Sequence, residues 1–161
     1  MENACLRESH VLFVVIINFN SPKLGFRKGS NGIAITATRS GFRILLGIII
    51  MLQLAGSTLS VDVLLETRDG YEPKIYDSVL SELNATCIVL PSLLVGSEYD
   101  FEIAEPQLWS FALLFSSFES VLFLDASSSL LRSSDALFHA KAFSTDGLVL
   151  WQSVGKSSIS S

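Results

Sequence analysis

The stretch SVLFLDA, residues Ser120–Ala126, is a short apolar run that ends in an acidic residue. Apolar side chains at successive positions, rather than at alternate ones, are typical of a strand buried on both faces of a parallel sheet. Asp125 would then lie at the carboxyl edge of that sheet, which is where ligands bind in open α/β folds. This stretch therefore predicts both a fold class and the place where a site should be sought.

Apolar runs and segments of helical length alternate along the chain on both sides of this stretch. The other expected strands are residues 31–37, 59–67, 85–91 and 147–151, and the expected helices are residues 42–56, 73–83, 105–118 and 133–143. Buried strands separated by helices indicate a mostly parallel sheet with helices on both faces, an α/β fold of the Rossmann-like kind. The run HVLFVVIINF, residues 10–19, fits an edge strand or a helix equally well.

Two expectations concern single helices. In the second helix Pro73 stands near the start, and Ile75, Val79 and Leu83 share one face that should meet the sheet. In the segment 133–143, Ser133 or Ser134 should cap a short helix.

The boundaries follow from these elements. Residues 1–29 form an N-terminal extension or edge strand, residues 30–151 a partial α/β domain, and residues 152–161 a serine-rich tail. At 161 residues and 49% hydrophobic composition, the chain has enough apolar mass for one core.

Charge and hydropathy exclude two classes of partner. The formal net charge is −5 and the basic residues are scattered, so the chain lacks the basic face that nucleic acid requires. The most apolar segment, Arg43–Gly56, is shorter than the roughly 20 residues of a spanning helix. The first ten residues carry Glu2 and Glu8 rather than the positive region of a signal peptide. We therefore expect neither a membrane anchor nor a signal peptide in this chain.

Several short motifs carry little chemistry by themselves. The segment TATRSG, residues 36–41, lacks the glycine spacing of a dinucleotide loop, and VGKSS near the end lacks the first glycine of a phosphate loop. Cys5 and Cys87 have no metal-ligand spacing and are expected to pack, with a disulfide as the alternative. Asn84-Ala85-Thr86 is an N-glycosylation sequon, which matters only in a chain that enters the secretory pathway.

The block FALLFSSFESVLFLDA, residues 111–126, resembles the core of the fungal Golgi α-1,2/α-1,3-mannosyltransferase family. The likeness extends to GSNGIAITATRSGFRILLG, YEPKIYDSVLSELNATCIVLP and LRSSDALFHAKAFSTDGLVLW, so it covers most of the chain. The resemblance implies a GT-A glycosyltransferase fold and transfer of mannose from GDP-mannose to a mannosyl glycan, with Mn²⁺ as cofactor. It also implies a type II membrane enzyme of the Golgi, whose anchor would lie outside this chain.

The resemblance assigns site residues by position. Asp125 matches the first acid of the family's metal motif, and Ser127 stands where the second acid belongs. Gly32, Thr36 and Ala37 match the first strand, where the nucleotide would lie.

Three departures from the family pattern concern the same function. Ser127 replaces an acid, Trp109 replaces a lysine, and Gln152 follows Trp151 where the family continues with proline. Loss of a carboxylate weakens a divalent site. The resemblance implies a glycosyltransferase-related protein like the α-mannosyltransferases that transfer mannose from GDP-mannose to mannosyl glycans, and these departures predict that its own activity is reduced or lost. The alternative is a catalytically inactive nucleotide-binding fragment or partner subunit of that fold.

The remaining acidic residues and the histidine in the second half of the chain are expected to serve the structure rather than a reaction. Asp135 and Asp146 suit helix caps and turns, Glu119 suits a cap or an ion pair, and Glu66 and His139 suit a solvated surface.

Overall fold

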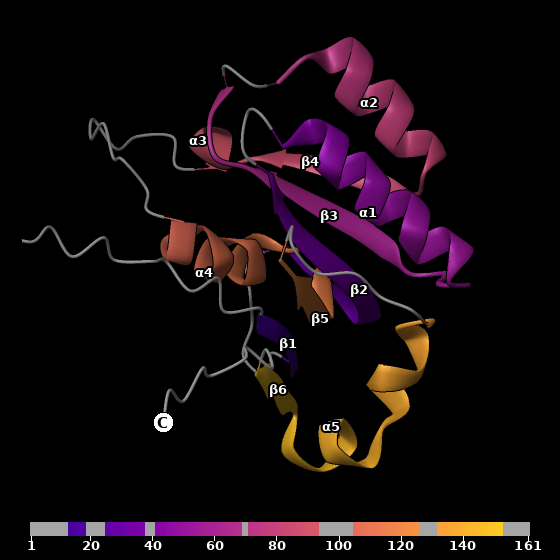
Figure 1. Cartoon of the computed structure of the whole chain (residues 1–161). Helices are drawn as coiled ribbons and strands as arrows, with labels where there is room; N and C mark the ends of the chain where they lie inside the picture. The colour runs from indigo at the N-terminus through magenta and orange to yellow at the C-terminus, as the bar shows by residue number, and fades with distance from the viewer. Residues whose placement is uncertain are drawn as a thin grey trace, which may run out of the picture.

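A computed structural model describes residues 13–18, 25–37, 41–68, 71–93, 105–125 and 132–152 (Figure 1). In chain order the strands are β1 (Phe13–Asn18), β2 (Arg27–Ala37), β3 (Ser60–Leu65), β4 (Ala85–Val89), β5 (Phe118–Leu124) and β6 (Leu148–Gln152). The helices are α1 (Phe42–Leu54), α2 (Pro73–Glu82), α3 (Leu90–Leu93), α4 (Glu105–Phe115), the 3-10 helix η2 (Asp135–His139) and α5 (Lys141–Asp146).

All six strands form one sheet in the order β4-β3-β2-β5-β1-β6. The strands β4, β3, β2 and β5 are parallel to one another, and β1 is antiparallel to both of its neighbours. The predicted mostly parallel α/β sheet is therefore confirmed. Four of the five predicted strands form its adjacent parallel strands, and the fifth is β6, which lies at the edge beside β1.

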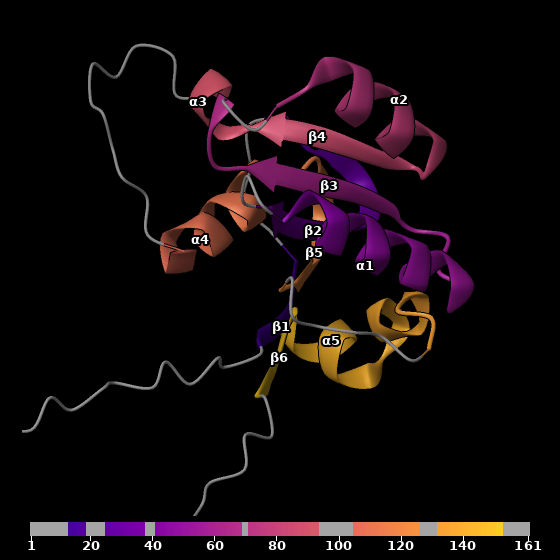
Figure 2. The ribbon, with the colours of Figure 1, turned by 45° about the horizontal axis from the view of Figure 1, so that its top comes forward.

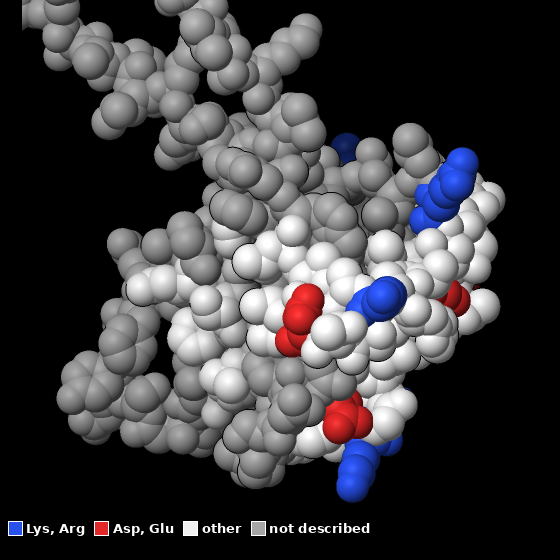
Figure 3. Space-filling view, turned by 90° about the horizontal axis from the view of Figure 1, so that it is seen from below, with Lys and Arg blue, Asp and Glu red and all other residues white. Residues whose placement is uncertain are grey.

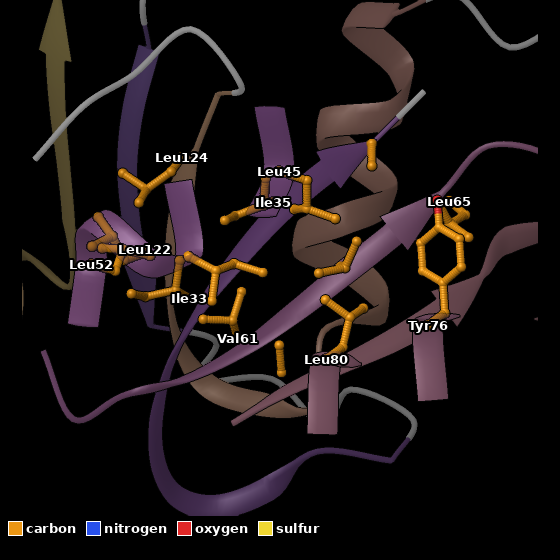
Figure 4. Close-up of a cluster of buried hydrophobic side chains, with 14 of the residues drawn as sticks. Ile33, Ile35, Leu45, Leu52, Val61, Leu65, Tyr76, Leu80, Leu122 and Leu124 are labelled. Carbon is orange, nitrogen blue, oxygen red and sulfur yellow. The ribbon is translucent and has the colours of Figure 1, made fainter. Parts of the chain in front are cut away.

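Successive residues of the central strands point to opposite faces of the sheet, and each face is covered. On one face, Ile33, Ile35 and Val63 pack with side chains of α1, α2 and the segment η2–α5 (Figure 4). On the other face, Ala34, Leu64 and neighbouring apolar residues pack with α4. Figure 2 shows α1 in front of the sheet, α2 above β4 at the top of the view, and α4 on the left, apart from both. Helices cover both faces of the sheet, as predicted, and they bury most of β3, β5 and the second half of β2, while β4 stays partly exposed.

The helix α1 confirms the helical reading of the most apolar segment but is buried on one side only. Leu45, Ile49 and Leu52 recur at helical spacing and face the core. Leu54, on the outer side, is 77% exposed. Gly56 adopts a left-handed φ of 84° just beyond the helix, and its backbone N–H donates to the Gln53 carbonyl. The predicted stop at Gly56 is therefore confirmed.

The predicted apolar face of α2 is wrong at Val79, which is 36% exposed, whereas Leu83 packs partly buried against the core as expected. Tyr76 and Leu80 are buried instead, and the side chain of Ile75 lies outside the described residues. The reason is aromatic packing: the ring of Tyr76 lies 4.7 Å from Phe42 of α1 and 5.7 Å from Tyr71. These contacts turn the helix so that Tyr76 meets α1.

Two further segments differ from expectation. The N-terminal run forms a strand, but β1 lies between β5 and β6 instead of at an edge. The single helix expected over 133–143 is two short ones, because the backbone of Ala140 is extended (φ −64°, ψ 140°) between η2 and α5. No helix within the described ranges is both long enough and apolar enough to cross a membrane.

Candidate functional site

The candidate site is the carboxyl edge of the sheet between β2 and β5. From β2 the chain proceeds outward to β3 and β4, and then crosses back so that β5 lies on the other side of β2. Such a reversal of strand order opens the sheet edge to ligands, because the loops on the two sides diverge. Ile35 of β2 pairs with Leu124 of β5, so Thr36 and Asp125 both follow that pair at this edge.

Thr36, Ala37 and Asp125 are thus brought to one edge, as the sequence predicted for the ends of these strands. Thr36 and Asp125 are half-buried. Ala37 is 5% exposed and its methyl group belongs to the core, so its backbone is the part that remains for a ligand. The ends of β2 and β5 therefore place these three residues at one edge of the sheet.

The amino end of α1 lies next to this edge because the helix begins shortly after β2. The first turn of α1 holds no acidic residue. Its N-cap residue is Gly41, which has no side chain that could cap the helix. Backbone N–H groups at a helix start favour an anionic group, and Arg43 in the same turn is exposed. Sequence reasoning did not single out Arg43; its place in the first helical turn after the first parallel strand is the signal that would have found it.

Gly32 lies in the middle of β2 and is not brought to this edge. It pairs with Val121 and Ser60, and four residues of strand separate it from Thr36, about 13 Å. A β-carbon on Gly32 would stand 2.2 Å from the ring of Phe118. The structure therefore shows a packing reason for glycine here, namely close contact with a buried aromatic ring.

Of the two residues predicted to hold a divalent cation, only Asp125 can be placed, because Ser127 lies outside the described residues. No cluster of three or more His, Cys, Asp or Glu residues that could hold a metal occurs in the part of the chain that the structure describes. Glu66 follows β3, two strands away from β5, which is about 10 Å in strand spacing. The described residues therefore do not make a metal centre by themselves.

Trp109, which stands at the family's lysine position, lies in α4 and packs toward the sheet. Its ring lies 6.0 Å from that of Phe123 in the cluster beneath α4. Its indole thus contributes to the core on that face.

Asp62 is a buried carboxylate that sequence reasoning did not assign. It is 4% exposed, and its Oδ2 accepts hydrogen bonds from the backbone N–H of Ser117 at 2.6 Å and the hydroxyl of Ser116 at 3.2 Å. Burial raises the pKa of Asp62, while the hydrogen bonds from Ser117 and Ser116 and the charge of Arg27 act in the other direction. Asp62 thereby fixes the turn between α4 and β5, and hence the register that delivers Asp125.

Asp135 is a structural carboxylate, as predicted, but it binds a neighbouring loop and does not cap a helix. Its two oxygens accept hydrogen bonds from the Ser57 hydroxyl at 2.7 Å, the Thr58 hydroxyl at 2.7 Å and the Thr58 backbone N–H at 3.0 Å. Partial burial acts to raise its pKa, but these hydrogen bonds prevail and lower it. Asp135 therefore ties η2 to the loop between α1 and β3.

Glu119, His139 and Asp146, which are expected to serve the structure, lie away from the carboxyl edge between β2 and β5. Glu119 accepts a hydrogen bond from the backbone N–H of Gly29 in β2, so it joins two strands and does not cap a helix. His139 and Asp146 are exposed in η2 and α5. Cys87 is a free thiol whose pKa is raised to about 12 by burial, as suits a packing residue. On the face in Figure 3, the charged side chains lie singly among uncharged ones.

Comparisons with known proteins agree on one family. The family model described as "Mannosyltransferase putative" matches residues 30–161. The alpha-1,2-mannosyltransferase MNN24 of Candida albicans is 32% identical over 99% of this chain and 23% of its own length. The alpha-1,2-mannosyltransferase MNN2 of Saccharomyces cerevisiae is 35% identical over 93% of this chain and 25% of its own length. The chain thus spans about a quarter of the length of these relatives, and it belongs to this mannosyltransferase family.

Proposed function

We propose that this chain is the donor-binding part of a mannosyltransferase that transfers mannose from GDP-mannose to a mannosyl glycan in an α-1,2 linkage. The observation that carries the proposal is the carboxyl edge between β2 and β5, where Thr36, Ala37 and Asp125 meet in a chain of this family. The relatives' names supply the sugar and the linkage. The site would operate in the lumen of the Golgi.

The proposed contacts follow from the geometry of that edge. The diphosphate of the donor would lie at the amino end of α1, where backbone N–H groups and Arg43 meet its negative charge. The nucleoside would lie along the end of β2, against Thr36 and the backbone of Ala37. Asp125 would lie on the β5 side of the donor.

We propose Mn²⁺ as the cofactor, with Asp125 and Ser127 as the residues that would hold it. A hard divalent cation takes oxygen ligands, and it would supply positive charge beside the leaving nucleoside diphosphate. One carboxylate holds such an ion weakly, so donor and metal should bind together rather than the metal alone. We therefore expect donor binding from this chain, with transfer by the chain alone reduced or lost.

A second candidate is a non-catalytic nucleotide-binding fragment or partner subunit of the same fold. The replacement of an acid by Ser127 favours it, because donor binding can survive the loss of one metal ligand more easily than catalysis can. Both candidates share the same donor site, and they differ in what Ser127→Asp does.

Calorimetric titration of GDP-mannose and GDP, with and without Mn²⁺, tests the proposal. Binding is expected to require the metal and to weaken by at least about tenfold in Asp125→Asn, since the variant keeps the shape but removes the charge. Asp146→Asn is the matched control, an exposed carboxylate on α5 that should leave binding unchanged. Absence of any GDP or GDP-mannose binding by the unaltered chain would overturn the proposal.

The variant Ser127→Asp separates the two candidates. Tighter Mn²⁺-dependent donor binding, with mannose transfer to a mannobiose acceptor, would identify a degenerate catalytic site. Tighter binding without transfer would favour the non-catalytic candidate. Unchanged metal dependence would show that residue 127 is not at the metal site.

A further inference from the structure

The turn between α2 and β4 holds the only N-x-Ser/Thr sequon of the chain, Asn84-Ala85-Thr86. Asn84 directly follows the C-cap residue of α2, Leu83, with a left-handed φ of 54°. Asparagine tolerates this conformation better than most residues do. Asn84 and Thr86 are both exposed, whereas Ala85 between them is buried. The two residues of the sequon that are chemically required therefore face solvent.

The hydrogen bonds of Asn84 are compatible with substitution on its amide nitrogen. Its Oδ1 accepts a hydrogen bond from the Ser60 hydroxyl at 3.0 Å, and its Nδ2 donates to the Thr58 carbonyl at 3.5 Å. A glycosylated amide loses one N–H and keeps the other, and its oxygen is untouched. Both contacts can therefore persist after modification. Separate hydrogen bonds hold the backbone of Asn84. Its N–H donates to the Ser81 carbonyl, and its carbonyl accepts a hydrogen bond from the Val61 N–H.

The turn lies at the edge of the sheet opposite the proposed donor site. Ala85 pairs with Val61 at the start of β3, whereas Val89 pairs with Leu65, which in turn pairs with Ala37. A whole strand thus separates Asn84 from the carboxyl edge, roughly 15 Å at ordinary strand rise. The strand β4 is also one of the two edge strands of the described sheet. A bulky group on Asn84 would project away from the sheet without covering the donor site.

We propose that Asn84 is an N-glycosylation site. In the transfer, Nδ2 forms a bond to the anomeric carbon of a lipid-diphosphate-linked oligosaccharide. The bond from that carbon to the diphosphate oxygen breaks, the lipid diphosphate leaves with the electron pair, and the proton lost from Nδ2 passes to a base of the transferase. The inference rests on the proposed function, since only a protein of the secretory pathway meets this donor.

Expression of the full chain behind a cleavable secretory leader in yeast tests the site independently of where the native protein resides. We expect one discrete increase in apparent mass that an endoglycosidase removes. Amidase digestion should convert the acceptor asparagine in the peptide containing Asn84 into aspartate, which mass spectrometry detects. The variant Thr86→Val should lose the increase, and Thr86→Ser should keep it. Both substitutions fall at an exposed position of β4, and valine keeps the β-branched shape, so the comparison isolates the hydroxyl.

A secreted chain that stays unmodified would overturn the inference, and so would a mass increase that survives Thr86→Val. To exclude poor secretion as the cause, the same secreted chain can carry a second sequon made by Ser144→Asn and Asp146→Thr, two exposed positions of α5. Modification of that sequon but not of Asn84 would show that the secreted chain reaches the transferase and that Asn84 itself is not an acceptor. GDP-mannose titration of the unmodified protein remains a separate test, so failure of the glycosylation site and failure of the donor site are distinguishable.

Discussion

At the scale of single residues, the two structural carboxylates respond to their surroundings in opposite ways. Asp62 is enclosed, and burial raises its pKa despite its hydrogen bonds. Asp135 is half-exposed, and its hydrogen bonds from Ser57 and Thr58 lower its pKa. Desolvation dominates for the first and hydrogen bonding for the second. The two residues should therefore give opposite contributions to the pH dependence of stability.

The raised pKa of Asp62 predicts a loss of stability as the pH rises. Its ordinary pKa is 3.8, so just above pH 3.8 the folded protein binds a proton that the unfolded chain releases. The contribution of this group is therefore fully present below pH 3.8 and is lost as the pH rises through the folded-state pKa. The variant Asp62→Asn has no proton to release. We expect thermal unfolding between about pH 3 and pH 7 to show that the melting temperature of Asp62→Asn increases relative to that of the unaltered chain as the pH rises.

The exposed carboxylate of Asp146 is the control for this measurement. Asp146→Asn removes the same charge from a solvated position on α5. Its melting temperature should run nearly parallel to that of the unaltered chain. Parallel profiles for Asp62→Asn as well would contradict the role given to burial.

At the scale of elements, α2 shows how packing decides which helical face is buried. Leu80 is 0% exposed and Val79, next to it, is 36% exposed. Leu80→Ala should lower the free energy of unfolding by about 2–5 kcal/mol, because it opens a cavity in the core. Urea unfolding followed by circular dichroism measures this loss. Val79→Ala, with its side chain on the outer face, should change it by less than about 1 kcal/mol.

The two variants form a matched pair, since both replace an aliphatic residue by alanine in one helical turn. Alanine also favours the helix, so a local helix effect would stabilise both. Equal costs would mean that Val79 is buried in solution, as its spacing with Ile75 and Leu83 had suggested.

The elements that sequence predicted best are those whose burial is uniform. The strands β3 and β5 and the second half of β2 are buried on both faces, and so they stand out as nearly continuous apolar runs whatever surrounds them. The face of α2 depends on rings of Phe42 and Tyr71, which lie elsewhere in the sequence. The spacing of apolar residues within α2 cannot reveal contacts with residues outside that helix.

The candidate site divides in the same way. Asp125 and Thr36 could be predicted, because a strand end fixes the place of the residue that follows it. Gly32 shares the strand with Thr36, but its partner Phe118 arrives from β5, some 86 residues further on. Asp62 and Arg43 were missed because their partners, the α4–β5 turn and the strand edge, exist only in the folded chain.

At the scale of the whole molecule, β1 joins β6 to the rest of the sheet. Ile16 pairs with Leu122 of β5 on one side and with Val149 of β6 on the other. Ile16→Pro removes a backbone N–H inside this sheet, which should cost about 1–3 kcal/mol. We expect hydrogen exchange to show faster exchange across β1 and β6, while β3 and β4 keep their protection.

Ile16→Val is the control, because valine keeps both the N–H and the β-branched side chain. It should leave the exchange of β6 unchanged. Loss of protection across all strands in Ile16→Pro would mean that the sheet unfolds as one unit, and retention of protection in β6 would mean that β6 is held by something other than β1.

The interior place of β1 has a consequence for biosynthesis. The first strand to leave the ribosome must wait for β5, which begins 100 residues after Asn18 and is made several seconds later at roughly 5–20 residues per second. During that interval β1 has no partner among its final neighbours, and β6 cannot close the sheet until β1 has paired. Such late pairing between strands that are far apart in the sequence is slow. Until it occurs, the apolar strand can pair with other chains and aggregate. Nascent chains of this protein should therefore depend on chaperones that hold the N-terminal strand until the fifth strand has emerged.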